Sequence, residues 1–260
     1  MCVILCKRLG SEDELDMAIS IGNSNIRVAA AFEQSLQIWK IAVAAEDLSD
    51  KLKNICSTAE RPLKRCIISS VKPELTDMIY RTLHPLCRSK PIVASLGPRF
   101  LLDYSGYNGL LGIDRAICCE AAYLLQKTPF IMIDLGTAST INVIDNKKRF
   151  IGGLIFPGVQ MGLSALSEKT ALLPHADLQL AAPLLGQNTN DCLLSGAIHG
   201  TALLLDNAIS RIWESMDTTG RTVITGGNAP FIMPSMKATC QYEENLIIKG
   251  LFAILDRNGN

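Results

Sequence analysis

The stretch Ile19-Ser20-Ile21-Gly22-Asn23-Ser24-Asn25-Ile26-Arg27-Val28 has a counterpart further along the chain, Ile133-Asp134-Leu135-Gly136-Thr137-Ala138-Ser139-Thr140-Ile141-Asn142. Each reads as an apolar strand that ends in a polar residue, followed by a glycine turn with small hydroxyl or amide residues and a second strand. The repeat predicts a duplicated fold in which each half offers a glycine turn to the phosphates of a nucleotide. The copies differ in one group that bears on function, because the second has Asp134 where the first has Ser20.

Strand and helix patterns continue outward from the two turns. We expect strands at 17–21, 26–33, 36–43, 66–71, 91–94, 130–134, 140–145, 150–156 and 222–225, and helices at 45–60, after Pro73, and at 114–127, 159–168, 189–215 and 241–256. Strands that alternate with helices are typical of α/β proteins with largely buried sheets. Because the three-strand opening occurs twice, the sequence predicts two similar domains, at 17–113 and 114–260, after an N-terminal extension at 1–16.

The composition argues against several classes of function. With 25 basic and 25 acidic residues, the chain has no charge excess that would favour nucleic acid or an anionic membrane. The nine cysteines include no Cys-x-x-Cys pair, and the start of the chain does not read as an export signal, so we expect reduced thiols in a cytoplasmic protein. The three histidines lack zinc-ligand spacing, so a metal would be a hard cation held by carboxylates and phosphate oxygens.

The second glycine turn carries the clearest signal of a site. Asp134 ends a strand, where a carboxylate can bind a cation, and Thr137 adds a hydroxyl donor beside the glycine. The alternative is a tight hairpin in which Asp134 only begins the turn. A further pair, Gly226-Gly227, follows a buried strand at the end where open α/β sheets bind ligands, and it leaves a flat surface for an adenine ring. Together these turns favour a nucleotide site over purely structural turns.

Two further segments are candidates for binding an acceptor substrate. In Gly112-Ile113-Asp114-Arg115, Asp114 is either a first-turn acid that stabilises the following helix or a general base that takes a proton from a substrate hydroxyl. Arg115 would then bind an anionic group of that substrate. At Thr189 the pattern favours an N-cap over a substrate contact, and at the run from Gly152 to Gly158 it favours a bend over a ligand contact.

The motifs, in their order along the chain, resemble the type III pantothenate kinases of the acetate-kinase/Hsc70/actin-like superfamily. The resemblance covers about residues 17 to 256, and each motif is weak alone while the ordered series is specific. The motifs are Ile21-Gly22-Asn23-Ser24, Ser69-Ser70-Val71-Lys72-Pro73, Gly112-Ile113-Asp114-Arg115, Asp134-Leu135-Gly136-Thr137, Gly152-Gly153-Leu154-Ile155-Phe156-Pro157-Gly158, Asn188-Thr189, Ser195-Gly196 and Thr225-Gly226-Gly227.

The resemblance implies two duplicated actin-like (ribonuclease H-like) domains with mixed central sheets. It also implies ATP-dependent phosphorylation of pantothenate to 4'-phosphopantothenate, the first step of coenzyme A synthesis, by a homodimer that uses Mg²⁺ and a monovalent cation, K⁺ or NH₄⁺. By position, Asp114 would accept the proton and Asp134 would ligate the monovalent cation. The implied ATP contacts are Ser20, Ile21, Gly22, Asn23, Ser24, Asn25, Ile26, Arg27, Thr137, Gly226 and Gly227, and the implied pantothenate contacts are Gly112, Ile113, Asp114, Arg115 and Thr189.

The first glycine turn departs from the family at Ser20. The family turn reads Asp-x-Gly-Asn-Thr, and its aspartate handles the magnesium that accompanies the phosphates. A serine hydroxyl supplies neither that charge nor a strong hard-cation ligand, and losing one such group typically lowers a rate by about a hundredfold to a thousandfold. Asp16 cannot easily replace it, because four residues back along a strand is roughly 13 Å.

Three interpretations therefore remain open at this stage. The first is a pantothenate kinase that Ser20 slows. The second is an inactive homologue that binds a nucleotide or a pantothenate-like ligand and acts as a regulatory or accessory protein. The third is a kinase of the same superfamily that acts on a sugar or another acid.

Overall fold

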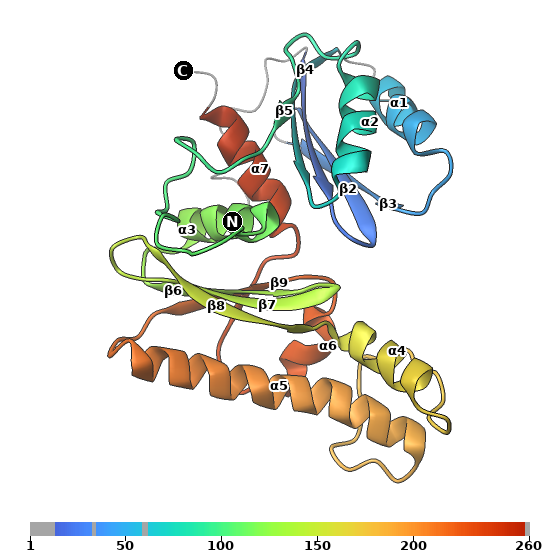
Figure 1. The fold of residues 1–260 in the computed structure, drawn as a ribbon, viewed down its shortest axis with the longest axis vertical. Coiled ribbons are helices and arrows are strands. Elements are labelled where there is room, and N and C mark those ends of the chain that lie inside the picture. The colour runs from blue at the N-terminus through green and yellow to red at the C-terminus, as the bar shows by residue number, and fades with distance from the viewer. Residues whose placement is uncertain (1–13, 33–34, 59–61, 258–260) are drawn as a thin grey trace. The chain divides into compact units, whose positions relative to one another are not determined.

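The computed structural model describes residues 14–32, 35–58 and 62–257, and its chain forms two compact units (Figure 1). Unit 1 comprises the described parts of Met1–Leu101, Gly109–Ala121 and Leu246–Asn260. Unit 2 comprises Leu102–Asn108 and Ala122–Asn245. Each unit contains one five-stranded sheet.

The sheet of unit 1 has the strand order β3-β2-β1-β4-β5. Strand β1 is antiparallel to β2 and parallel to β4, β2 is antiparallel to β3, and β4 is parallel to β5. The strands are β1 (Leu15–Ile21), β2 (Asn25–Phe32), β3 (Ser35–Ala42), β4 (Leu63–Ser70) and β5 (Ile92–Val93), and the helices are α1 (Leu48–Thr58), α2 (Pro73–Leu83), most of α3 (Ile113–Leu125) and α7 (Leu246–Asp256).

Alternation along β1 gives this sheet two buried faces. Met17 and Ile19 point to the face that α1 and α2 cover, where Leu52 and Ile79 are buried with them. Ala18 points to the opposite face and packs in a cluster with residues of α3 and α7. Because side chains of a strand alternate between faces, Ser20 lies on the same face as Ala18, toward the carboxyl end of the strand.

The sheet of unit 2 repeats this topology strand for strand. Its order is β10-β9-β6-β7-β8, with β6 antiparallel to β7 and parallel to β9, β7 antiparallel to β8, and β9 parallel to β10. The strands are β6 (Phe130–Leu135), β7 (Ala138–Ile144), β8 (Phe150–Pro157), β9 (Arg221–Thr225) and β10 (Gln241–Tyr242), and the helices are α4 (Val159–Lys169), α5 (Thr189–Ser215), α6 (Ala229–Ile232) and the 3₁₀ helix η1 (Met233–Ser235).

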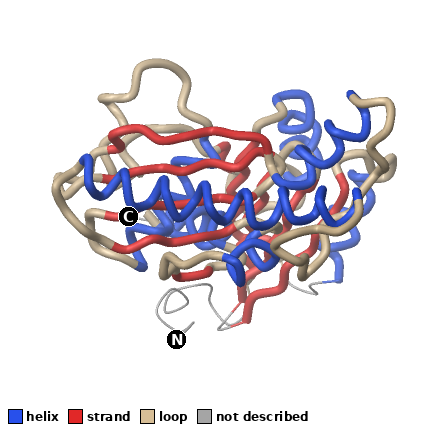
Figure 2. Tube along the Cα trace, turned by 90° about the horizontal axis from the view of Figure 1, so that it is seen from below, coloured by secondary structure: helices blue, strands red, loops and turns tan. Residues whose placement is uncertain are grey.

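Helix α5 covers one face of the second sheet and runs along it, as Figure 1 shows, and the long helix in front of the strands in Figure 2 gives the same view from below. Its residues Ile198, Ala202 and Leu205 are buried in one cluster with Ile133 of β6 and Ile224 of β9. Helix α5 is also long and apolar enough to span a membrane by length and composition, a test that the core helix of a soluble protein passes as well.

The α/β fold with two duplicated mixed sheets is as predicted, and most elements lie within a few residues of their expected places. Helix α2 begins with Pro73 and has Glu74 in its first turn, because proline lacks the donor that a helix start leaves unpaired and an acid there complements the helix dipole. Strand β1 begins at Leu15, so Leu15 and Asp16 belong to the sheet and not to the predicted extension.

The end of the chain differs from the prediction in two respects. The helix expected at 241–256 begins only at Leu246, because Gln241 and Tyr242 pair with β9 as strand β10. That helix, α7, belongs to unit 1, whereas the sequence places everything after residue 113 in the second domain. Its buried apolar residues pack in one cluster with residues of the first sheet and α3, which explains why α7 belongs to unit 1.

The described cysteines are free thiols within the described part of the chain. Burial raises the pKa of Cys56 and of Cys240 to about 11, so both remain protonated near neutral pH. Cys2 and Cys6 lie outside the described residues.

Candidate nucleotide and substrate sites

The turn after β9 packs directly on the turn after β6 in unit 2. Gly226 has a positive φ of 100°, and a Cβ atom at this position would lie 2.5 Å from the backbone of Leu135 and 2.6 Å from Asp134 Oδ1. No other residue fits both the backbone conformation and the space. Gly227, in contrast, has no atom within 4 Å of the position of a Cβ, so its surface is open.

The end of β8 joins the same cluster through Gly158. Its N–H donates to the Thr137 carbonyl over 3.1 Å, and a Cβ there would lie 2.2 Å from that oxygen. Asn228 adds two bonds, since its N–H donates to the Leu135 carbonyl and its Nδ2 donates to the Gly136 carbonyl. We call Gly136, Thr137, Gly158, Gly226 and Asn228 the glycine cluster. It brings the carboxyl ends of β6, β8 and β9 together.

Asp134 lies beside this cluster and between two hydroxyl residues. In the register of the sheet, Asp134 faces Thr140 of β7 on one side and Thr225 of β9 on the other. Directly opposed residues of neighbouring strands point to the same face, so the row presents one carboxylate flanked by two hydroxyl groups. Such oxygens suit a hard cation.

The first glycine turn, in unit 1, has the same register but different side chains. Ser20 faces Arg27 of β2 and Ser69 of β4. The Gly22 N–H donates to the Asn25 carbonyl over 3.0 Å, which closes the turn. Ser20 and Ser69 are only 5% and 1% exposed, respectively. The row therefore presents one guanidinium and two hydroxyl groups, and no carboxylate.

Asp16, the nearest acid before Ser20 in the chain, is bound elsewhere. It is fully buried and accepts hydrogen bonds from the Arg65 Nε and Nη2, at 3.0 and 2.5 Å. The same guanidinium donates to Asp256 Oδ1 at 2.9 Å. Hydrogen bonding to Asp16 raises the pKa of Arg65, so the guanidinium stays charged. Asp16 is thus neutralised at the opposite end of β1 from the glycine turn, as its distance along the strand predicts.

Asp114 lies in the first turn of α3, in unit 1. Its Oδ1 accepts a hydrogen bond from the Arg115 N–H over 2.9 Å. A Cβ on Gly112 would come within 2.6 Å of the same oxygen, so glycine leaves room for the carboxylate. Asp114 is partly exposed, whereas Arg115 is nearly buried. Both predicted roles of Asp114, helix stabilisation and proton acceptance, are compatible with this geometry.

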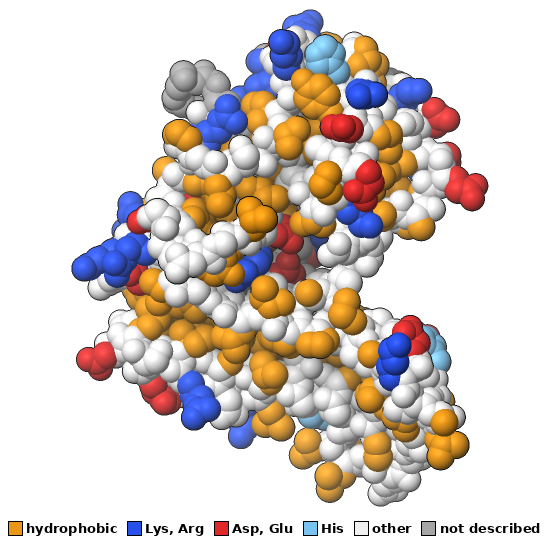
Figure 3. All heavy atoms as spheres, viewed as in Figure 1, with side chains coloured by type: hydrophobic (Ala, Val, Ile, Leu, Met, Phe, Trp, Pro, Cys, Tyr) orange, Lys and Arg blue, Asp and Glu red, His pale blue; other side chains and the backbone are white. Residues whose placement is uncertain are grey.

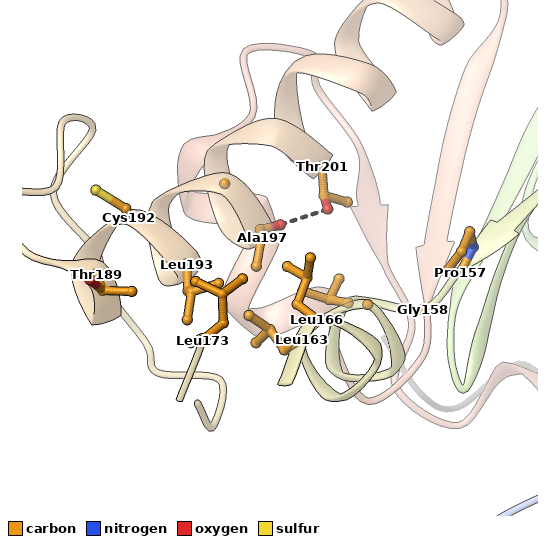
Figure 4. A pocket seen from close by; sticks show the side chains of 13 residues that line it. Pro157, Gly158, Leu163, Leu166, Leu173, Thr189, Cys192, Leu193, Ala197 and Thr201 are labelled. Atoms are coloured by element: carbon orange, nitrogen blue, oxygen red, sulfur yellow. Dashed lines mark hydrogen bonds between the residues drawn. The ribbon is translucent and has the colours of Figure 1, made fainter. Parts of the chain in front are cut away.

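A cavity of about 480 Å³ lies between α4 and α5 in unit 2 (Figure 4). Its lining is mainly apolar, with Leu163, Leu166 and Leu193 prominent, and Thr189 lies at one end. Pro157 and Gly158 also line it, so the cavity adjoins the glycine cluster. Thr189 is the first residue of α5 but not its N-cap: the Asn188 side chain accepts from the Asp191 N–H over 3.0 Å, which corrects the N-cap predicted at Thr189.

The predicted site residues divide between the two units. The turn from Ser20 to Arg27 and the segment from Gly112 to Arg115 are in unit 1, and the predicted contacts Asp134, Thr137, Thr189, Gly226 and Gly227 are in unit 2. Within unit 2, Asp134, Thr137 and Gly226 are brought together at one edge.

Three residues of these edges had no predicted role. Gly158 was expected to make only a bend, Ser69 was noted only as part of a motif, and Asn228 was not singled out. The position of Asn228 directly after Gly226-Gly227 is the signal that could have identified it. Ser69 could have been found only by pairing β4 with β1, which a single strand pattern does not give.

No group of three or more histidine, cysteine, aspartate or glutamate side chains is arranged to hold a metal ion in the part of the chain that the structure describes. A cation at Asp134 would therefore need backbone, hydroxyl or ligand oxygens as its other ligands.

The family model and the similar curated proteins carry the same family description. The model of the family described as type III pantothenate kinase matches residues 17–211. The type III pantothenate kinase of Persephonella marina is 31% identical to this chain, with 85% of each chain covered. That of Desulforapulum autotrophicum is 30% identical, with 93% of this chain and 96% of the relative covered.

Solved structures share the fold at lower identity. A chain from Campylobacter jejuni described as a Baf family transcriptional activator is 24% identical, with a TM-score of 0.61 over 93% of this chain and 98% of that one. The activator of 2-hydroxyisocaproyl-CoA dehydratase from Clostridium difficile, with bound ADPNP, is 9% identical, with a TM-score of 0.53 over 94% of each chain. These likenesses show the actin-like fold, and the matched sequences add the family. The chain belongs to the type III pantothenate kinase family.

Proposed function

We propose that this chain transfers the γ-phosphoryl group of ATP to the primary hydroxyl of pantothenate, which yields 4'-phosphopantothenate for coenzyme A synthesis. The observation that carries the proposal is membership of the family over most of the chain. The topology that the two sheets share supports it, since the central strand of each sheet leads into a glycine turn of the kind that approaches phosphates.

Asp114 is the proposed proton acceptor for the pantothenate hydroxyl. A carboxylate that takes the proton as the oxygen attacks makes the hydroxyl a better nucleophile, an effect worth about a hundredfold to ten-thousandfold in rate. Arg115, beside it, would bind the pantothenate carboxylate. In unit 2, Thr189 is a further proposed pantothenate contact, and the apolar cavity next to it suits an aliphatic group.

We propose ATP contacts at the glycine turn of each unit, taken separately. In unit 2, Thr137 would donate to a phosphate, and the open surface of Gly227 beside Gly226 would receive the adenine ring. Asp134, with the hydroxyls of Thr140 and Thr225 in its row, would hold the monovalent cation, K⁺ or NH₄⁺, whose charge offsets that of the phosphates. In unit 1, the turn from Ser20 to Arg27 would contact the phosphates.

Magnesium fits the first glycine turn poorly. Mg²⁺ prefers carboxylate oxygens, whereas the row at this turn consists of Arg27, Ser20 and Ser69. The residues of this turn therefore do not fit a magnesium ion held by the protein.

We further propose a cytoplasmic homodimer. Several large apolar side chains are exposed on unit 2, and apolar side chains are visible at the surface around α4 and α5 in Figure 3. Leu172 is 92% exposed, and exposed apolar surface of this extent is typical of an interface. Further exposed apolar residues of unit 2 include Ile155, Leu180, Leu184, Leu185, Leu203 and Leu204. Light scattering should give twice the mass of one chain, and a monomer at micromolar concentration would contradict the dimer.

The activity is tested by release of ADP from ATP in the presence of pantothenate. The Asp114→Asn variant should lose about a hundredfold or more in kcat. Asp50→Asn is a matched control, because Asp50 is also a first-turn acid but is exposed on α1, and it should keep wild-type activity. If the wild type released no ADP with pantothenate, yet bound ATP, the chain would be an inactive homologue. If a sugar or another acid were the better acceptor, the substrate assignment would be wrong.

A further inference from the structure

The two rows of side chains at the carboxyl edges of the sheets have opposite charge. In unit 2 the row is Thr140, Asp134 and Thr225, with one negative charge. In unit 1 the equivalent row is Arg27, Ser20 and Ser69, with one positive charge. At the centre of the row, Asp134 in unit 2 corresponds to Ser20 in unit 1. Beside it, Thr140 in unit 2 corresponds to the basic residue Arg27 in unit 1.

The polar groups of the first row are not used by the protein itself. Within the residues that the structure describes, no side-chain hydrogen bond involves Ser20 or Ser69, and neither hydroxyl is among the fully buried polar atoms without a partner, where only Ser139 Oγ is found. Arg27 likewise forms no ion pair with any described residue and is only partly exposed. The two hydroxyls and the guanidinium are therefore available to donate to a ligand that approaches the turn.

The chemistry of this row matches a phosphate group and not a divalent cation. A guanidinium and two hydroxyls can all donate hydrogen bonds to phosphate oxygens, and the guanidinium also neutralises charge. A positive row repels a cation and offers it no charged oxygen. The acid that precedes this position in β1, Asp16, is fully buried and bound to Arg65.

Lys72 adds a second positive charge near the same edge. The Val71 N–H donates to the carbonyl of Ile21, at the end of β1, so the segment after β4 lies against the turn. The Ser70 side chain fixes the next residue, since it accepts from the Lys72 N–H and donates to the Lys72 carbonyl, both over 2.9 Å.

We infer that the first glycine turn binds the nucleotide phosphates directly, through Arg27 and the hydroxyls of Ser20 and Ser69, so that this chain binds ATP without requiring Mg²⁺. The inference rests on the proposed nucleotide site. Arg27 takes the charge-neutralising role at this turn that a metal held by a carboxylate would otherwise have.

Calorimetric titration of the full chain with ATP tests the inference without measuring turnover. The titration is made at constant K⁺, once with excess Mg²⁺ and once with EDTA. The two dissociation constants should agree within about threefold. A wild-type chain that binds ATP tenfold or more weakly in EDTA would overturn the inference while leaving the kinase assignment intact. No binding of ATP in either buffer would overturn the nucleotide site as well.

Ser20→Asp and Ser20→Asn form a matched pair, because they have the same shape and differ in charge. Ser20→Asp should bind ATP at least tenfold more weakly in EDTA, and Mg²⁺ should restore the affinity, since a carboxylate beside phosphates requires a bridging cation. Ser20→Asn should show no such dependence on Mg²⁺. Circular dichroism checks that both variants are folded. If the folded variants showed the same change in ATP affinity between Mg²⁺ and EDTA, the inference would be overturned.

Arg27→Gln provides a second test on the neighbouring strand. Because hydrogen bonds to charged groups contribute about 1.5–3 kcal/mol, this variant should lose about tenfold to a hundredfold in affinity in both buffers. Lys40→Gln is its control: Lys40 is opposite Arg27 on β3, one strand further from Ser20, and is exposed. Loss of affinity in Lys40→Gln equal to that in Arg27→Gln would contradict a specific role of Arg27.

Discussion

The two sheets repeat one topology, and their carboxyl edges differ in both packing and charge. At the second sheet the glycine cluster is tightly packed, with backbone atoms within 2.5 Å of where a Cβ on Gly226 would lie. At the first sheet the turn is looser, since a Cβ on Gly22 would be 3.1 Å from the Asn25 carbonyl. The second edge carries an acid, Asp134, and the first carries a base, Arg27. A duplicated backbone thus sets where a ligand approaches, while the side chains decide whether an anion or a cation is held there.

The central strands also place their acids at opposite ends. Asp134 is at the carboxyl end of β6, near the glycine cluster, whereas Asp16 is near the amino end of β1 and bound to Arg65. An acid on the central strand can therefore serve a site at the carboxyl end of one sheet and the stability of the fold near the amino end of the other.

The largest expected effect is on the acid of β1. Arg65→Met should lower the free energy of unfolding by about 3 kcal/mol, because it leaves Asp16 buried without its partner. Urea denaturation measures this change. Arg88→Met is the control, since Arg88 is largely exposed where it pairs with Glu14, and it should cost below about 1 kcal/mol. A stable Arg65→Met variant would show that Asp16 is not held in place by this pair.

The difference in packing between the turns predicts the next effect. Gly226→Ala should destabilise the protein by about 3 kcal/mol, because it combines a positive φ with a clash against the backbone of Leu135. Gly22→Ala should cost about 1 kcal/mol, and Gly227→Ala, in open space, should cost less. Thermal and urea unfolding of the three variants would rank them. Equal costs would mean that the second turn is not the more tightly packed one.

Asp134→Asn tests whether the acid of the second edge binds a cation. We expect about a hundredfold loss of kcat together with loss of activation by K⁺, since one electrostatic group near the phosphates is removed. Asp145→Asn removes an acid from the opposite end of the same hairpin, where Asp145 pairs with Arg149, and should keep the response to K⁺. Unchanged K⁺ activation in Asp134→Asn would place the cation elsewhere.

The smallest expected effect concerns Ser69. Ser69→Ala removes one neutral hydrogen bond to a phosphate and should weaken ATP binding about fivefold, with no change in the effect of Mg²⁺. Ser57→Ala, on the exposed face of α1, is a control for the loss of a hydroxyl. If Ser69→Ala bound ATP with wild-type affinity, the Ser69 hydroxyl would not contact the phosphates.

The sequence predicted most elements because their patterns are local. The repeat of Ile19–Val28 and Ile133–Asn142 identified the two hairpins, and β-rich apolar runs identified strands such as β6. The start of α7 was misplaced, because Gln241 and Tyr242 form a strand only through pairing with β9. The N-cap of α5 was displaced by one residue, since Asn188 and Thr189 are both suitable caps and the choice depends on backbone conformation.

The candidate site was predicted only in part, because local patterns identify single residues but not the contacts between strands. Asp134 and Gly226 were named from strand-end patterns, but their contact with each other depends on β6 and β9 being neighbours. Gly158 joins the cluster only because β8 ends at the same edge.

By itself, the sequence determined the duplicated α/β fold, the family, and the substitution of Ser20 for an acid, because hydrophobic period, turn residues and residue identity are properties of short segments. Only the tertiary structure decided that Ser69 and Arg27 flank Ser20, that Asp16 is bound to Arg65, and that α7 packs on the first sheet. These are relations between segments 7 to about 235 residues apart in sequence, and strand register and helix packing set them through the burial of apolar surface.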